Sequence, residues 1–429
     1  MQSLRNKALQ ALRSSEPFFK LDMVYATKGG FWTTLSFAIG AVCSLATMIA
    51  FGNLLPRETY GIYSYLISLG SSLTFLTLSG IGPAVTRAVA RGIENIVPYA
   101  LRMQLRYNLL AVATIGVAAL YYSYKGNFTF GISLAFLATA YPIAEAFHIY
   151  VQVLTGKKRF DLLTKLTSAI NITAAVATVI TLLLTGNVLV IVLVFAFMSL
   201  VPKILAYRWV IRKLDKSLPR PEDLKEMRRT AFHITGAGII GTVASYIDKI
   251  ILFQVAGPVA LAIYGFATAG PERLKSLLKG WISIALPRLT ESSIHEIRSV
   301  FYKRIGLSVL IGTLLAVIYI IFSPPLFQWF LPKYLDSIFY SQIYALSLVA
   351  VPITIYTGSI FASQNMLRAI YAFNIGSQVA RIVLFLIFGW LWQTWGLIVA
   401  SLLSCLVNTI YTIMIWEFEI HRLIKKQST

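Results

Sequence analysis

Charged residues are scarce in this sequence. Asp, Glu, Lys and Arg make up 13% of the 429 residues, about half the share of an average soluble domain, whereas hydrophobic residues make up 57%. A soluble fold of this length needs more polar surface than such a composition supplies. The composition therefore excludes an ordinary cytosolic or secreted globular protein.

Residues that carry metal and covalent chemistry are scarce as well. The chain has four His and two Cys, and both Cys43 and Cys405 lie inside apolar runs, which supports neither a disulfide framework nor a metal site. It lacks a phosphate-binding Gly-x-x-x-x-Gly-Lys-Ser/Thr loop, a His-Glu-x-x-His motif and a nucleophile-elbow serine. We therefore expect no catalytic residues, no cofactor, no metal and no enzymatic activity.

What the sequence does contain is a series of long apolar runs with short polar breaks. Runs of about 20 residues predict transmembrane helices, and continuous rather than alternating apolar character excludes transmembrane strands. The expected fold is an all-α integral membrane protein with about twelve transmembrane helices, near 30–53, 62–83, 105–122, 129–152, 162–184, 188–207, 232–256, 259–282, 304–323, 341–362, 371–391 and 395–416.

The positive charges fall on one side of these helices. There are 38 Lys and Arg against 17 Asp and Glu, a formal net charge of +21. With the N-terminus inside, 31 of the 38 lie in inner segments and only Arg57, Lys125 and Lys333 in outer ones. This asymmetry predicts a multi-pass protein of the cytoplasmic membrane with both termini cytoplasmic. The net charge thus indicates topology, and we expect no nucleic-acid partner.

The longest inner loop divides the helices six to six. An even number of spans per half gives both halves the same orientation, so a repeat would be a parallel pseudo-repeat. The expected organisation is a cytoplasmic amphipathic N-terminal segment (1–28), an N-lobe (29–207), a cytoplasmic linker (208–230), a C-lobe (231–418) and a cytoplasmic tail (419–429).

Ionisable residues inside the spans are costly and are therefore functional candidates. Asn374, Gln378 and Arg381 share one helical face, as do Tyr141, Glu145, His148 and Gln152. A water-filled cavity between two lobes would use such residues to attract an anion and to couple ions. The candidate substrate-binding cations are Arg381, Lys249, Arg273, Lys275 and Arg87, the other cavity-lining polar residues are Asn374, Gln378, Tyr141 and Gln152, and the ion-coupling candidates are Asp248, Glu145, His148 and Glu272.

These residues also have a structural interpretation. Asp248 and Lys249 could be neutralised by other helices, and Glu272 with Lys275 could form an i, i+3 ion pair. Arg87 is a cation at the cytoplasmic edge, which topology alone explains.

Seven short motifs resemble the polysaccharide-exporter branch of the multidrug/oligosaccharidyl-lipid/polysaccharide (MOP) superfamily. They occur in the order Glu58–Tyr63, Gly80–Arg87, Gly156–Phe160, Tyr246–Leu252, Leu261–Tyr264, Ala285–Leu289 and Lys333–Ser337. The resemblance implies a MATE-like fold and a flippase of the Wzx type, which moves an undecaprenyl-diphosphate-linked oligosaccharide across the membrane by alternating access, with H+ or Na+ as the possible coupling ion. It also implies lipid bilayer, lipid-linked glycan and other polysaccharide-assembly proteins as partners.

Two other functions remain open at this point. A drug or small-solute cation antiporter of the same superfamily would have a similar helix pattern. A membrane-embedded glycan polymerase belongs to another class, and short outer loops with few His disfavour it.

Overall fold

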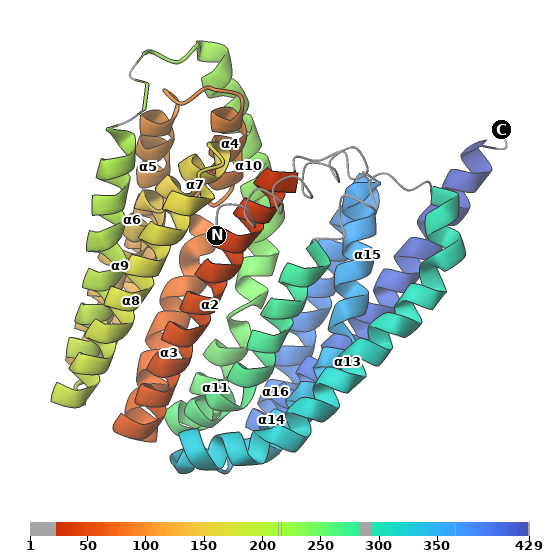
Figure 1. Ribbon diagram of the computed structural model, residues 1–429. Coiled ribbons are helices and arrows are strands. Elements are labelled where there is room, and N and C mark those ends of the chain that lie inside the picture. The colour runs from red at the N-terminus through yellow and green to blue at the C-terminus, as the bar shows by residue number, and fades with distance from the viewer. Residues whose placement is uncertain (1–22, 213, 216, 284–293, 365, 428–429) are drawn as a thin grey trace, which may run out of the picture. The chain divides into compact units, whose positions relative to one another are not determined.

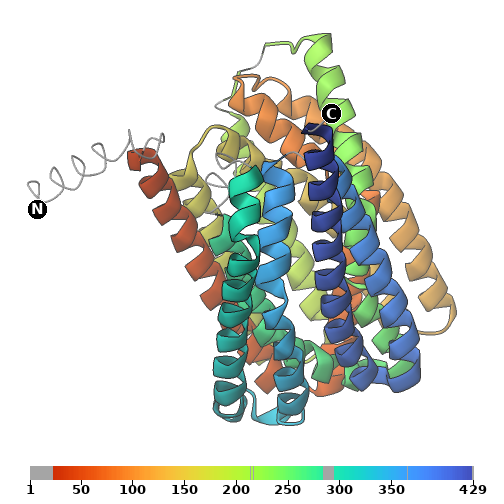
Figure 2. The same ribbon diagram turned by 90° about the vertical axis from the view of Figure 1, so that its right-hand side faces the viewer.

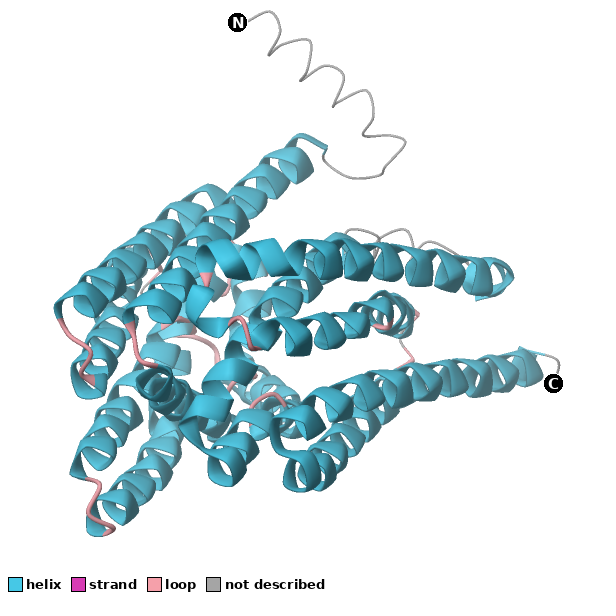
Figure 3. Ribbon diagram, turned by 90° about the horizontal axis from the view of Figure 1, so that it is seen from below, coloured by secondary structure: helices cyan, strands magenta, loops and turns pink. Residues whose placement is uncertain are grey.

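The computed structural model describes residues 23–212, 214–215, 217–283, 294–364 and 366–427, and these residues form helices and loops without strands (Figures 1 and 3). Most of the expected N-terminal segment 1–28 lies outside the described residues. The same holds for the Ala285–Leu289 motif.

The helices agree with the expected membrane spans. In the described part of the chain, nine helices are long and apolar enough to cross a membrane, and a bent pair, Arg57–Leu76 with Ile81–Ala90, is a tenth candidate. Two of the nine, Pro221–Leu278 and Arg368–Arg422, have 58 and 55 residues. At 1.5 Å per residue each would be over ~80 Å long, against a hydrocarbon core of ~30 Å. Each therefore supplies two spans, which brings the number to the expected twelve.

The backbone shows where these two long helices divide. Gly257 has φ 81°, a left-handed conformation that glycine adopts readily, and it divides α11 (Ile247–Ser283) just before Pro258. In α16 (Leu367–Gln427), Trp392 and Gln393 leave the helical conformation. Both breaks fall between predicted spans.

The described contacts group the chain into two compact units. The first contains residues up to Ala50 and Leu76–Thr235, and the second contains Phe51–Phe75 and Gly236–Thr429. The expected N-lobe includes residues 51–75, whereas here they group with the C-terminal half. The reason is packing, since α3 (Arg57–Ser72) packs along α11. The division into two six-helix lobes and the pseudo-repeat stay predictions.

The first unit is a bundle in which neighbouring helices are joined by short loops. Asn127 and Asn187 cap the N-termini of two helices by accepting hydrogen bonds from the backbone N–H groups of Phe130 and Leu189. Packing contacts pair α5 with α6, α6 and α8 with α9, and α4 with α7 (Figure 1). The bounds are α2 (Met23–Leu54), α4 (Ile81–Ala90), α5 (Val97–Tyr124), α6 (Phe128–Phe147), α7 (Ile149–Gly156), α8 (Phe160–Leu184), α9 (Val188–Ile211) and α10 (Pro221–Ala244), with α10 entering the second unit at Gly236.

The second unit is organised around α11. This helix packs on α3, α14 and α16, and α13 lies beside α15 (teal and blue in Figure 2). α3 approaches α11 closely at Gly61, where a Cβ atom would lie 1.9 Å from the Pro258 carbonyl oxygen. The remaining bounds are η1 (Leu73–Leu76), α13 (Ile294–Phe330), η2 (Pro332–Tyr334), α14 (Ser337–Ala345), η3 (Leu346–Val349) and α15 (Val351–Ser363).

A group of polar contacts in the second unit joins the end of α2 and the start of α3 to the segment around η2. Arg57 pairs with Asp336 at 2.7 Å and also donates to the Lys333 carbonyl, while Lys333 donates to the Asn53 carbonyl. Arg57 also lies 5.3 Å from the centroid of the Tyr334 ring. Burial raises the pKa of Tyr334 to about 12, so its hydroxyl stays protonated at neutral pH. The Lys333–Ser337 motif therefore contacts Asn53 and Arg57, the residue directly before the Glu58–Tyr63 motif.

Candidate functional site

The second unit contains a cavity of about 190 Å³ with charged walls. Four of its lining residues are Glu272 and Lys275 from α11, Tyr344 from α14 and Arg381 from α16. Three of these four are residues that the sequence nominates for substrate binding or ion coupling. The fold therefore brings together candidates from helices that are distant in the chain.

Glu272 is held by two donors. Lys275 Nζ lies 2.8 Å from Glu272 Oε1, and the Tyr344 hydroxyl donates to the same oxygen at 2.5 Å. The Lys275 ammonium also lies 4.2 Å from the centroid of the Tyr344 ring. Only 11% of the Lys275 side chain is exposed, compared with 52% for Glu272. The i, i+3 ion pair thus forms, and its carboxylate remains open to the cavity.

Asp248 is buried beside the same cluster. The Tyr264 hydroxyl donates to Asp248 Oδ2 at 2.7 Å, whereas Oδ1 has no described hydrogen-bond partner. Lys249 follows on α11, about 100° around the helix, and is not among the residues that line the cavity. Asp248 does not line the cavity either, but it is close enough to Arg381 to attract the guanidinium, and no such interaction is described for Lys249.

Arg381 enters the cavity without a direct counter-ion. Its guanidinium lies over the Phe385 ring at 5.0 Å, and its Nε has no described hydrogen-bond partner. No described carboxylate forms an ion pair with it, although Asp248 and Glu272 both attract it at longer range. Asn374 and Gln378 precede it on α16 and do not line this cavity. Arg381 is therefore a cavity cation that no described carboxylate contacts.

The second polar group lies in the first unit. Tyr141, Glu145, His148 and Gln152 are expected on one helical face, and the structure has them on a candidate span, Phe128–Gly156, with a one-residue break between α6 and α7. His148 lies at this break, and Pro142 within α6 removes a backbone donor from the same helix. Tyr141 is half-buried on α6.

Two members of this group have identified partners. Glu145 pairs with Lys203 of α9 at 3.0 Å, and the Thr86 hydroxyl donates to Gln152 at 3.0 Å. By sequence position Lys203 counts among the inner-loop cations. The structure places it within α9, where it neutralises Glu145, so Glu145 fits the role of a structural ion pair.

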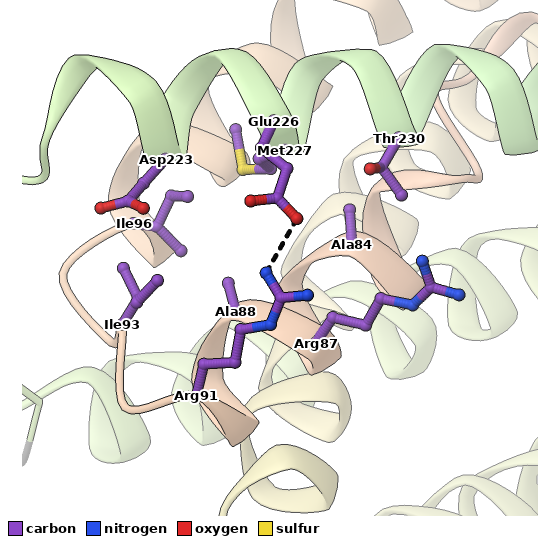
Figure 4. A pocket seen from close by; sticks show the side chains of 10 residues that line it. All are labelled: Ala84, Arg87, Ala88, Arg91, Ile93, Ile96, Asp223, Glu226, Met227 and Thr230. Carbon is purple, nitrogen blue, oxygen red and sulfur yellow. Dashed lines mark hydrogen bonds and ion pairs between the residues drawn. The ribbon is translucent and has the colours of Figure 1, made fainter.

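Two candidate arginines lie outside the cavity. Arg273 is exposed on α11 and does not line it. Arg87 is exposed on α4 of the first unit, where it lines a small pocket with Arg91 (Figure 4). In this pocket Arg91 pairs with Glu226 of α10 at 2.8 Å.

The tyrosines of the cluster are functional candidates that the sequence pattern did not single out. Tyr264 and Tyr344 are buried and donate to Asp248 and Glu272. These tyrosines could have been found from the sequence, because a tyrosine inside an apolar run needs a hydrogen-bond partner for its hydroxyl. Among the described residues, no group of three or more His, Cys, Asp or Glu is arranged to hold a metal ion.

Several solved structures of membrane transporters have a similar fold. An outward-facing multidrug resistance MATE family transporter of the MOP superfamily matches with a TM-score of 0.59 and 14% identity, over 92% of this chain and 96% of that one. The lipid II flippase MurJ, in an inward closed conformation, matches with a TM-score of 0.63 and 12% identity, over 90% and 87%. A MOP superfamily transporter from Pyrococcus furiosus, described by the reverse polarity of its binding pocket, matches with a TM-score of 0.57 and 14% identity, over 91% and 95%. The fold is therefore that of MOP superfamily transporters, as the motifs predicted.

The sequence itself assigns the family. No curated protein matches the chain. The family model described as polysaccharide biosynthesis protein matches residues 26–293, which is more than half of the chain. This multi-pass membrane protein belongs to that family.

Proposed function

We propose that this protein is a flippase. Its substrate would be an undecaprenyl-diphosphate-linked oligosaccharide, which it moves from the cytoplasmic to the outer leaflet of the cytoplasmic membrane by alternating access. Membership of the polysaccharide biosynthesis family and the transporter fold both support this function over that of a glycan polymerase. The observation that carries the proposal is the cavity cation Arg381, which lacks a direct counter-ion among the described residues.

The chemistry of the cavity suits an anionic headgroup. A guanidinium binds two oxygens of a phosphate at once, and it does so more strongly in a site with little water. Lys275 would be a second cation, whose charge is neutralised by the ion pair with Glu272 at 2.8 Å. Protonation of Glu272 would weaken this pair and raise the net charge of the cavity by one. Glu272 and Asp248 are therefore the candidates for ion coupling.

The antiporter alternative has one specific observation in its favour. The cluster holds two carboxylates, Asp248 and Glu272, and two cations, Lys275 and Arg381, so its formal net charge is zero. An organic cation would bind there only if the carboxylates turned toward it. Both carboxylates already accept hydrogen bonds from tyrosines, which favours the anionic substrate.

The decisive experiment is reconstitution. Purified protein in proteoliposomes should move an undecaprenyl-diphosphate oligosaccharide between leaflets, and an imposed H+ or Na+ gradient should stimulate this movement. Export of a cationic dye without glycan movement would assign the protein to the antiporter class instead. Elongation of the glycan would assign it to the polymerases.

A further inference from the structure

A second basic site lies in the first unit. A groove of about 870 Å³ runs between the first turns of α5 and α10, and its walls contain Arg102 and Arg106 from α5 with Lys225 and Arg228 from α10. Its volume is within the range of small-molecule sites. This groove shares no residue with the cavity of the second unit.

The four cations of the groove form no ion pair with any described carboxylate, and none of the residues that line the groove is acidic. Two of the three acidic side chains in the first turns of α10, Asp223 and Glu226, line the small pocket, and Glu226 pairs with Arg91 (Figure 4). The third, Glu222, is exposed and lines neither the small pocket nor the groove. Positions 225 and 228 lie one turn apart on one side of α10.

The walls of the groove combine charge with apolar surface. Met103 and Leu110 of α5 and Leu224 of α10 line it, and the Tyr107 and Phe232 rings meet edge to face at 5.2 Å between the two helices. Arg102 and Arg106 are four residues apart, so their Cα atoms are separated by about 6 Å along α5. A ligand that fits this arrangement has adjacent negative charges joined to a hydrocarbon chain.

We infer that this groove binds the diphosphate headgroup of a polyprenyl lipid. Four cations without ion-pair partners match the two to three negative charges of a diphosphate better than the single charge of a phosphodiester lipid. In the orientation that the positive-inside rule predicts, this end of α5 and α10 faces the cytoplasm, where the lipid-linked glycan is made. The inference rests on the proposed function and gives the headgroup a loading site separate from the Arg381 cavity.

Binding tests the groove independently of transport. Undecaprenyl diphosphate, undecaprenyl monophosphate and cardiolipin would be titrated into the purified full-length protein in detergent, with mass spectrometry of the intact complexes. We expect the diphosphate to bind most tightly, and the double variant Arg102→Gln/Arg106→Gln to bind it at least about tenfold more weakly. Equal affinity for cardiolipin, lost in the same variant, would overturn the assignment in favour of an anionic phospholipid site.

Residue 229 supplies a matched control. Arg229 follows Arg228 on α10, is also exposed and does not line the groove. Arg228→Gln should weaken diphosphate binding and Arg229→Gln should not, while both variants keep the melting temperature of the wild type because both side chains are at the surface. Equal effects of the two substitutions on diphosphate binding would overturn the assignment of the binding site to this groove. Failure of wild-type flipping with intact diphosphate binding would overturn the proposed function alone.

Discussion

Arg381 concentrates the positive charge of the second unit's cavity on a side chain that the surrounding carboxylates do not touch. Its guanidinium has Phe385 below it and an Nε atom without a described hydrogen-bond partner. Structural arginines in apolar surroundings usually satisfy their donors within the protein. Under the proposed function, the phosphate of the substrate would bind the donors that Arg381 leaves without a partner in the protein.

The Arg381→Ala variant should lose transport but keep its fold. We expect flipping in proteoliposomes to fall by at least about tenfold, since a charge-assisted contact to phosphate is lost. Thermal stability should change little, because removing a buried charge without an ion-pair partner also removes its desolvation cost. The Arg381→Lys variant keeps the charge without the bidentate geometry, so its transport rate should lie between those of the wild type and Arg381→Ala. Wild-type transport in Arg381→Ala would make Arg381 a structural residue.

Asp248 is an ion-coupling candidate with one described hydrogen-bond donor, the Tyr264 hydroxyl. The Asp248→Asn variant should transport at a rate that no longer responds to the imposed H+ or Na+ gradient, because an amide cannot gain or lose the proton. Tyr264→Phe removes the hydroxyl that donates to Asp248 at 2.7 Å and leaves the carboxylate in place. That variant should therefore keep its response to the gradient. A normal gradient response in Asp248→Asn would exclude Asp248 from coupling.

At the scale of the elements, the contact between α3 and α11 determines which helices form the second unit. Gly61 lies against the Pro258 backbone so closely that any side chain would displace one of the two helices. In the sequence, the Glu58–Tyr63 motif indicates only a family resemblance, and the structure supplies the physical reason for its glycine. The partner could not be predicted, because the period of a helix says which face is apolar but not which helix covers it.

The Gly61→Ala variant should be strongly destabilised. Its side chain would meet the Pro258 backbone, which cannot move aside as a side chain can, so we expect the melting temperature to fall by about 5 °C or more. Gly70 lies on the same helix, and a Cβ atom added there would have no neighbouring atom within 4 Å, so Gly70→Ala is the matched control. Fluorescence-detected size-exclusion chromatography after heating measures both. Similar melting temperatures for the two variants would contradict the close packing.

At the scale of the whole molecule, topology is the property that the sequence predicts most fully. The 31 Lys and Arg of the expected inner segments can be counted from the sequence alone. That count predicts the orientation because membrane insertion responds to the charge of short loops. Such counting does not give the partner of Lys203, since the ion pair with Glu145 on α6 could be found only in the folded structure.

Cysteine accessibility tests this topology. In a background with Cys43 and Cys405 replaced by Ser, Leu218→Cys in the expected inner loop should be protected from a membrane-impermeant maleimide in intact cells. Lys125→Cys in the expected outer loop should react. Both positions are exposed, so accessibility depends on the side of the membrane rather than on burial. The reverse labelling pattern would invert the orientation and place the α5–α10 groove on the outer side.

The amino-acid sequence by itself determined the membrane class, the helix number, the expected orientation and the helical stripe that ends in Arg381. These properties depend on the hydropathy and charge of neighbouring residues, which the chain carries before it folds. Only the tertiary structure decided that Tyr344 and Glu272 share the Arg381 cavity, that Lys203 neutralises Glu145 and that four cations of α5 and α10 face one groove. Those outcomes depend on which helices pack together, and in a membrane nearly every helix is apolar enough to be any other helix's neighbour.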